Sequence, residues 1–62
     1  MPVTERPKLL TVPQTARLLA CGRDKVYDLL HRGEIEGVML DGRRRIVRES
    51  LDAFVRRLRE AS

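Results

Sequence analysis

TVPQTARLLACGRDKVYDLLHRG, residues 11–33, is the stretch that decides the fold, because it reads as two short helices around a tight corner. Thr11 is a natural helix N-cap, and Pro13 falls near the first turn, where its missing N–H costs nothing. Four small or apolar residues then recur at helical spacing: Val12, Ala16, Leu19 and Ala20. The pattern predicts a first helix from about Pro13 to Ala20 with one apolar face.

The corner lies at Cys21 and Gly22, which interrupt the helical pattern. Gly22 can adopt a positive φ or cap a following helix without steric penalty. The pattern resumes from Arg23 to His31 and ends at Gly33, since glycine is favoured just past a helix C-terminus. Its apolar side carries Val26, Leu29 and Leu30. Two short helices joined by such a turn have the layout of a helix-turn-helix, whose second helix can lie in a DNA major groove.

The segment that follows, Gly37 to Val47, predicts a β-hairpin. We expect a three-residue loop with Gly42 in the left-handed region and a bulge. That register keeps Val38 and Ile46 together on the inner face. It also turns Arg43 and Arg45 outward as a pair and lays the aliphatic stem of Arg44 over the edge of the core.

Three consecutive arginines, Arg43 to Arg45, follow the Asp41-Gly42 turn signal. Like charges on neighbouring strand positions repel one another, so they reduce stability unless an anionic partner is present. Residues 1–42 carry six basic and six acidic groups, whereas residues 43–62 carry seven arginines and three acidic groups. The whole net charge of +4 therefore lies in the last third of the chain. This excess favours a polyanionic partner, although a solvated basic surface is the alternative.

The last element is predicted to be a helix packed on the other two. Leu51, Phe54, Val55 and Leu58 fall at i, i+3, i+4 and i+7. We expect Phe54 and Leu58 to anchor this helix. Toward its C-terminal end lie Arg56, Arg57 and Arg59. The sequence leaves three roles open for these arginines: a solvated face, a phosphate contact or a docking surface for another protein.

Composition limits the chemistry. A chain of 62 residues buries only about 60% of the surface that its unfolded form exposes, which leaves little room for a large catalytic cleft. No Ser/His/Asp set, paired-carboxylate pocket or phosphate-binding glycine loop is evident. We therefore expect neither catalysis nor a cofactor. The single cysteine, Cys21, is expected to be a small buried residue, and His31 an exposed one.

The sequence contains no Cys/His cluster with metal-ligand spacing, so no metal site is expected. No apolar run of about 18 residues is present, and the N-terminus lacks the apolar stretch of a signal peptide. The expectation is a cytoplasmic protein without membrane contact. The scarcity of aromatic residues disfavours single-stranded nucleic acid as a ligand, because stacking needs aromatic platforms.

LLTVPQTARLLACGRDKVYDLLHRGEIEGVMLDGRRRIVRESLDAFV, about residues 9–55, resembles the excisionase family of small winged helix-turn-helix proteins, which are related to the DNA-binding domain of MerR-like regulators. The most telling motifs are LLTV, VYDLLHRGEI, and GRRRI followed by a helix that begins near RESL. The chain departs from the family pattern at Ala20-Cys21-Gly22, where Gly-Val-Ser is common. It also departs at Arg44 and Val47, where an aromatic residue and a proline are common.

The resemblance implies a mainly α fold with a small β-hairpin: a winged helix-turn-helix of three helices and a two-stranded wing. We expect residues 1–8 to be a flexible segment and residues 9–60 to form this domain. The implied function is that of a recombination directionality factor of a phage or mobile element, acting in a bacterial host. Several copies would align head to tail on repeated sites, bend double-stranded DNA and help a cognate integrase to excise. The alternatives are a small MerR-like transcriptional regulator and a protein-interaction module.

The resemblance also implies that the second helix enters the major groove. Arg23 and Lys25 can donate to guanine or phosphate. Three roles are open for Asp24 and Asp28: contact with cytosine amino groups, ion pairs with neighbouring basic residues, or orientation away from the DNA. Of these we expect the ion pairs. Tyr27 either reaches a phosphate or packs against the wing. The expected DNA-binding residues are Arg23, Asp24, Lys25, Tyr27, Arg32, Arg43, Arg44 and Arg45, with Arg43 and Arg45 in the minor groove and Arg44 on a phosphate or over the core.

Overall fold

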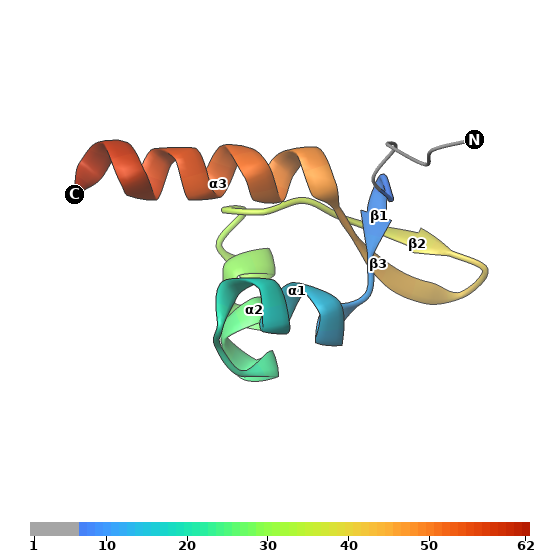
Figure 1. The fold of residues 1–62 in the computed structure, drawn as a ribbon. Helices are drawn as coiled ribbons and strands as arrows, with labels where there is room; N and C mark the ends of the chain where they lie inside the picture. Colours follow the sequence, from blue (N-terminus) through green and yellow to red (C-terminus); the bar gives the residue numbers. More distant parts are fainter. Residues whose placement is uncertain (1–6) are drawn as a thin grey trace, which may run out of the picture.

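The computed structural model describes residues 7–62, which form three helices and a three-stranded antiparallel sheet (Figure 1). In chain order the elements are β1 (Leu9–Leu10), α1 (Val12–Leu19), α2 (Arg23–His31), β2 (Gly37–Leu40), β3 (Arg43–Val47) and α3 (Arg48–Ala61). The expected mainly α architecture with a hairpin wing is confirmed. Residues 1–6 of the expected flexible segment lie outside the described residues, whereas Lys8 is held, because its carbonyl accepts a hydrogen bond from the Arg48 N–H at 2.9 Å.

Helix α1 begins with a capping box. The Thr11 hydroxyl accepts from the Gln14 N–H at 3.1 Å, and the Gln14 side chain accepts from the Thr11 N–H at 2.9 Å. The predicted N-cap is therefore confirmed. Thr15 is fully buried, and its hydroxyl donates to the Thr11 carbonyl at 3.0 Å, which satisfies the polar group in the core.

The corner between α1 and α2 places the strained backbone on an alanine. Ala20 ends α1 with a φ of 56°, in the left-handed region, while Gly22 has a φ of −86° and is the N-cap of α2. Of the two roles predicted for Gly22, the structure uses the cap. The left-handed residue allows the N–H groups of Ala20 and Cys21 to bond carbonyls of the last turn of α1, including that of Ala16. Such bonds satisfy a helix C-terminus and offset the conformational cost of about 1 kcal/mol.

The sheet has the order β1-β3-β2, so β3 is its central strand. Strands β2 and β3 pair with Leu40 opposite Arg43, Met39 opposite Arg44, Val38 opposite Arg45 and Gly37 opposite Ile46. This register corrects the predicted one: a two-residue turn replaces the three-residue loop. Val38 lies on the face opposite to that of Ile46, because neighbouring strand residues alternate between faces.

Two local features explain the observed register. Asp41 and Gly42 both have positive φ, 52° and 75°, as in a type I′ turn, whose twist matches that of a two-stranded ribbon. Asp tolerates this conformation better than most residues. At the other end of the pair, a Cβ on Gly37 would lie 2.9 Å from Leu30 Cδ2, so a larger residue opposite Ile46 would require the Leu30 side chain to shift.

The core is aliphatic, and residues from all three helices and from strands β1 and β3 contribute to it. Its buried members are Leu10, Val12, Ala16, Val26, Leu29, Ile35, Ile46 and Leu51. Ile46 and Val26 are 0% exposed. Cys21 is only partly buried against this cluster, so its expected full burial is not observed, whereas His31 is exposed as expected.

Helix α3 is held at its N-terminal half. Leu51 is buried and Phe54 packs against the core, but Leu58 is 50% exposed, so the expectation that Leu58 anchors the helix is wrong. Figure 1 shows that the C-terminal end of α3 extends away from the sheet. A groove of about 350 Å³ runs beside Phe54 and Leu58 and is lined on its other side by Leu19 of α1, Cys21 of the corner and Leu29 of α2. The predicted packing of this helix on the other two is therefore incomplete.

Arg57 fastens α3 to the loop after α2. Its Nη2 donates to the Glu34 carbonyl at 2.9 Å and to Glu34 Oε1 at 3.3 Å, and its guanidinium lies 5.8 Å from the centre of the Phe54 ring. Of the three arginines whose role the sequence left open, Arg57 has a structural contact. The Ser50 hydroxyl adds a second link, because it accepts from the Glu36 N–H at 2.9 Å.

Truncation of Phe54 and of Leu58 should have unequal effects on stability. Phe54→Ala removes a ring that packs on the core and carries the Arg57 contact, so we expect it to lower the free energy of unfolding by about 2–3 kcal/mol. Leu58→Ala, on a half-exposed side chain, should cost about 0.5 kcal/mol. Thermal unfolding followed by circular dichroism measures both. Equal losses would show that Leu58 anchors the helix after all.

Candidate nucleic-acid interface

Helix α2 turns Val26 and Leu29 into the core and leaves its other sides to solvent. Arg23 and Tyr27 are both exposed and lie at i and i+4, so they share one helical face. Gly22 supplies no side chain to the helix N-terminus, whose N–H groups and positive dipole end favour an anion. The start of α2 therefore presents a cation, a phenol and a helix N-terminus together.

Asp28 is paired within α2. Its Oδ2 lies 3.2 Å from Arg32 Nε and 3.8 Å from Lys25 Nζ, so the expected ion pairing is confirmed for this residue. Within residues 7–62, neither Arg23 nor Asp24 has an ion-pair partner, so the pairing expected for Asp24 is not observed. Arg23 is thus a cation of α2 that remains available to a ligand.

The wing, defined as β2, the Asp41-Gly42 turn and β3, places its arginines on two faces. Arg43 and Arg45 share one face, as predicted. Arg44 lies on the other face, where Met39 is its cross-strand partner. Arg43 and Arg44 are exposed, so Arg44 does not cover the core. Arg45 is half-buried, and its Nη1 donates to the Arg44 carbonyl at 3.2 Å. No acidic side chain of the described chain pairs with any of the three.

A hollow of about 530 Å³ joins the wing to the helices. Tyr27, which is 42% exposed, and the three wing arginines all line this hollow. The remaining lining residues are Thr11, Val12 and Pro13, at the start of α1. The structure thus brings together Tyr27, Arg43, Arg44 and Arg45 from segments far apart in the sequence. Sequence reasoning missed Thr11 and Pro13 as lining residues, because their signal is that of a helix cap.

Two of the expected binding residues lie elsewhere. Lys25 and Arg32 line the groove between α2 and α3, with Phe54 and Leu58, and not the hollow beside the wing. Both are also paired with Asp28. Spacing explains this separation, because residues seven apart return to the same side of a helix, whereas Tyr27 lies just over half a turn, about 200°, from Lys25.

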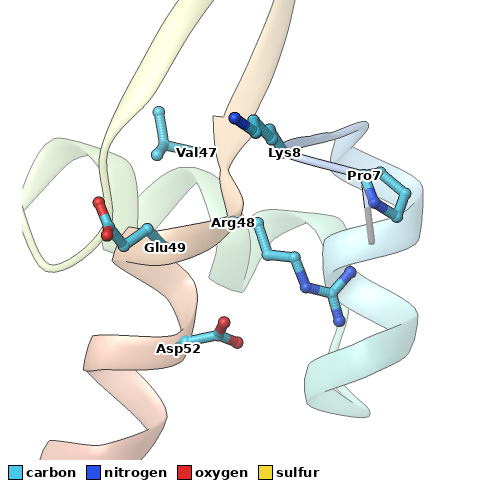
Figure 2. A pocket seen from close by; sticks show the side chains of 6 residues that line it. All are labelled: Pro7, Lys8, Val47, Arg48, Glu49 and Asp52. Carbon is cyan, nitrogen blue, oxygen red and sulfur yellow. The ribbon is translucent and has the colours of Figure 1, made fainter. Parts of the chain in front are cut away.

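A second pocket, of about 430 Å³, lies at the start of α3 (Figure 2). Two basic residues, Lys8 and Arg48, and two acidic residues, Glu49 and Asp52, line this pocket. Pro7 and Val47 complete its walls. The Arg48 side chain extends toward α1, and its Nε is buried without a hydrogen-bond partner among the described atoms. Because its charges balance and none of its residues lies on α2 or among the wing arginines, we assign no nucleic-acid contact to this pocket.

Within residues 7–62, no group of three or more His, Cys, Asp or Glu side chains is placed to hold a metal ion. None of the helices in the same range is both long and apolar enough to cross a membrane.

Comparison with known proteins agrees with this geometry. Residues 9–59 match the family model described as a helix-turn-helix domain. A protein of Streptomyces ambofaciens named excisionase is 38% identical over 52 residues, which are 84% of this chain and 84% of the relative. A probable excisionase of Saccharopolyspora erythraea is 46% identical over 50 residues, which are 81% of this chain and 51% of the relative, so the chain spans about half the length of that protein.

Proposed function

This chain belongs to the excisionase family of helix-turn-helix DNA-binding proteins, and from that membership we propose that α2 enters the major groove of duplex DNA while the wing enters the adjacent minor groove. The observation that carries the proposal is the hollow between Tyr27 and the wing arginines. A protein that occupies two adjacent grooves must accommodate the sugar-phosphate strand between them. The hollow is lined by Tyr27 and by the strand that carries the three wing arginines, so a phenol and positive charge lie beside its path.

The residues divide by role under this proposal. Arg23, in the first turn of α2, reads base edges, since Arg donates two hydrogen bonds to guanine O6 and N7. Tyr27 and Arg44 hold the phosphates of the strand in the hollow. Arg43 and Arg45 face the minor groove, where the negative potential is greatest over A·T-rich sequence. Lys25 and Arg32, on the far side of α2, contribute general positive charge.

We further propose that several copies bind neighbouring sites head to tail, bend the DNA and assist a cognate integrase in excision. The names of the two relatives support excision as the process. The excess of positive charge supports wrapping of DNA on the protein, because neutralisation of phosphates offsets the cost of bending. The test is an excision assay with the integrase, in which addition of this protein should be required for recombination and should increase the DNA bend.

Arg23→Ala should weaken binding to the specific site more than binding to scrambled DNA. We expect a loss of about 1–3 kcal/mol on the specific duplex, because a bidentate base contact is removed, and a smaller loss on the scrambled one. Fluorescence anisotropy at fixed salt measures both affinities. Arg17→Ala, on the exposed side of α1, is the matched control for loss of one charge. Equal losses on the two duplexes would refute base reading by Arg23.

A further inference from the structure

Two apolar side chains lie exposed at the end of the wing. Met39 is 63% exposed and Leu40 is 47% exposed, immediately before the Asp41-Gly42 turn. The chain covers each of these residues only in part, so apolar surface remains open to solvent at the tip. Exposed large apolar residues grouped at one point of a surface are typical of an interaction site.

The strand register places these two residues on opposite faces of the wing. Leu40 lies directly opposite Arg43, and Met39 lies directly opposite Arg44. Each face of the tip therefore carries one apolar side chain beside one guanidinium. The two walls of a minor groove have the same composition, because apolar deoxyribose carbons lie below the charged phosphates. The tip is thus complementary in chemistry to both walls at once.

The width of the tip determines what its entry does to DNA. A β-ribbon with side chains on both faces is on the order of 10 Å thick, whereas the minor groove of B-form DNA is about 6 Å wide. A tip with two long apolar side chains does not fit unless the groove opens. Proteins that insert apolar side chains into this groove open it and bend the duplex toward the major groove.

We propose that Met39 and Leu40 act as an apolar wedge that opens the minor groove when the wing enters it, so that the wing selects deformable A·T sequence and produces part of the bend. This inference rests on the proposed binding of the wing in the minor groove. It distinguishes between two kinds of A·T-rich DNA. Arginines alone favour tracts of consecutive adenines, where the groove is narrowest, whereas a wedge favours alternating TA steps, which deform easily.

The test uses two duplexes derived from a site that the wild-type protein enriches from a random pool. The duplexes are identical except in the wing-facing segment, which is either a run of about six adenines or the same length of alternating TA steps. Each carries a single site, so that contacts between copies do not contribute. We expect the wild-type protein to bind the alternating duplex about tenfold more tightly and to bring its labelled ends closer in a fluorescence energy-transfer assay.

The variant is Met39→Thr/Leu40→Thr, because threonine removes the apolar bulk and retains strand propensity. It should lose the preference for alternating steps or reverse it toward the adenine tract, and it should bend the alternating duplex less. Leu58→Gln, which changes a comparably exposed apolar residue on α3, is the matched control and should retain the preference. Circular dichroism establishes that both variants are folded.

Other outcomes overturn the wedge. Preference of the wild-type protein for the adenine tract would show that arginines alone read the groove. An altered affinity only on duplexes with several sites would assign Met39 and Leu40 to contacts between copies. If replacement of the wing arginines had no effect on either duplex, the proposed minor-groove binding would itself fail, which is a separate result from loss of the TA preference.

Discussion

Ile46→Ala is expected to leave most of the domain unfolded at 25 °C. Ile46 is 0% exposed and lies in the central strand, where it pairs with Leu10 of β1 and with Gly37 of β2. Truncation of a buried isoleucine costs about 2–5 kcal/mol, whereas a single core in a domain of this size supplies about 3–5 kcal/mol. The helical signal at 222 nm and a urea titration measure the loss.

Ile46→Val is the matched control for this position. It removes one methylene and should cost only about 0.5–1.5 kcal/mol, so the domain should remain folded and bind DNA. The comparison separates the loss of buried volume from any effect on the strand itself, because both isoleucine and valine are β-branched. A folded Ile46→Ala variant with an unchanged urea midpoint would contradict the position of Ile46 at the centre of the core.

Replacement of Arg43 and Arg45 by alanine should produce the largest change in DNA binding. Each charge that no longer neutralises a phosphate lowers the slope of log K against log salt by about 0.9, so the double variant should lose up to about 1.8 in slope. Arg45 is half-buried and bonded to the Arg44 carbonyl, so Arg43 should contribute the larger part. A salt titration of binding measures the slope, and the loss of affinity should be greatest where the wing-facing segment is A·T-rich.

Folding should be unaffected or slightly favoured in this double variant. The wing arginines have no acidic partner within residues 7–62, and their removal relieves repulsion between like charges. Arg56→Ala/Arg59→Ala removes the same net charge from exposed positions of α3 and is the matched control. If the control lowers the slope as much as the wing variant does, the effect belongs to total charge and the wing does not touch DNA.

The two halves of the site differed in how well the sequence predicted them. Helix α2 is predicted well: its range, Arg23–His31, and its ion pair at Asp28 follow from contacts within four residues of one another, and capping is one of the two roles that the sequence offers for Gly22. Contact of Tyr27 with the wing is one of the two alternatives that the sequence offers, but the sequence does not separate Tyr27 from Lys25 and Arg32, which lie in the groove beside α3. The position of the neighbouring elements decides this, and helical spacing alone does not contain it.

The sequence by itself determined the order of the three helices and the hairpin, the cap at Thr11 and the helix stop at Gly33, because short-range hydrogen bonds and residue periodicity specify them. The family followed from the resemblance of about residues 9–55, and the family model matches residues 9–59. Only the tertiary structure decided the hairpin register, the left-handed Ala20 and the exposure of Leu58. The register and Ala20 depend on competing local solutions, such as a two-residue or a three-residue turn, whereas the exposure of Leu58 depends on which residues of distant segments lie beside α3. Packing selects among conformations that local propensity leaves nearly equal in free energy.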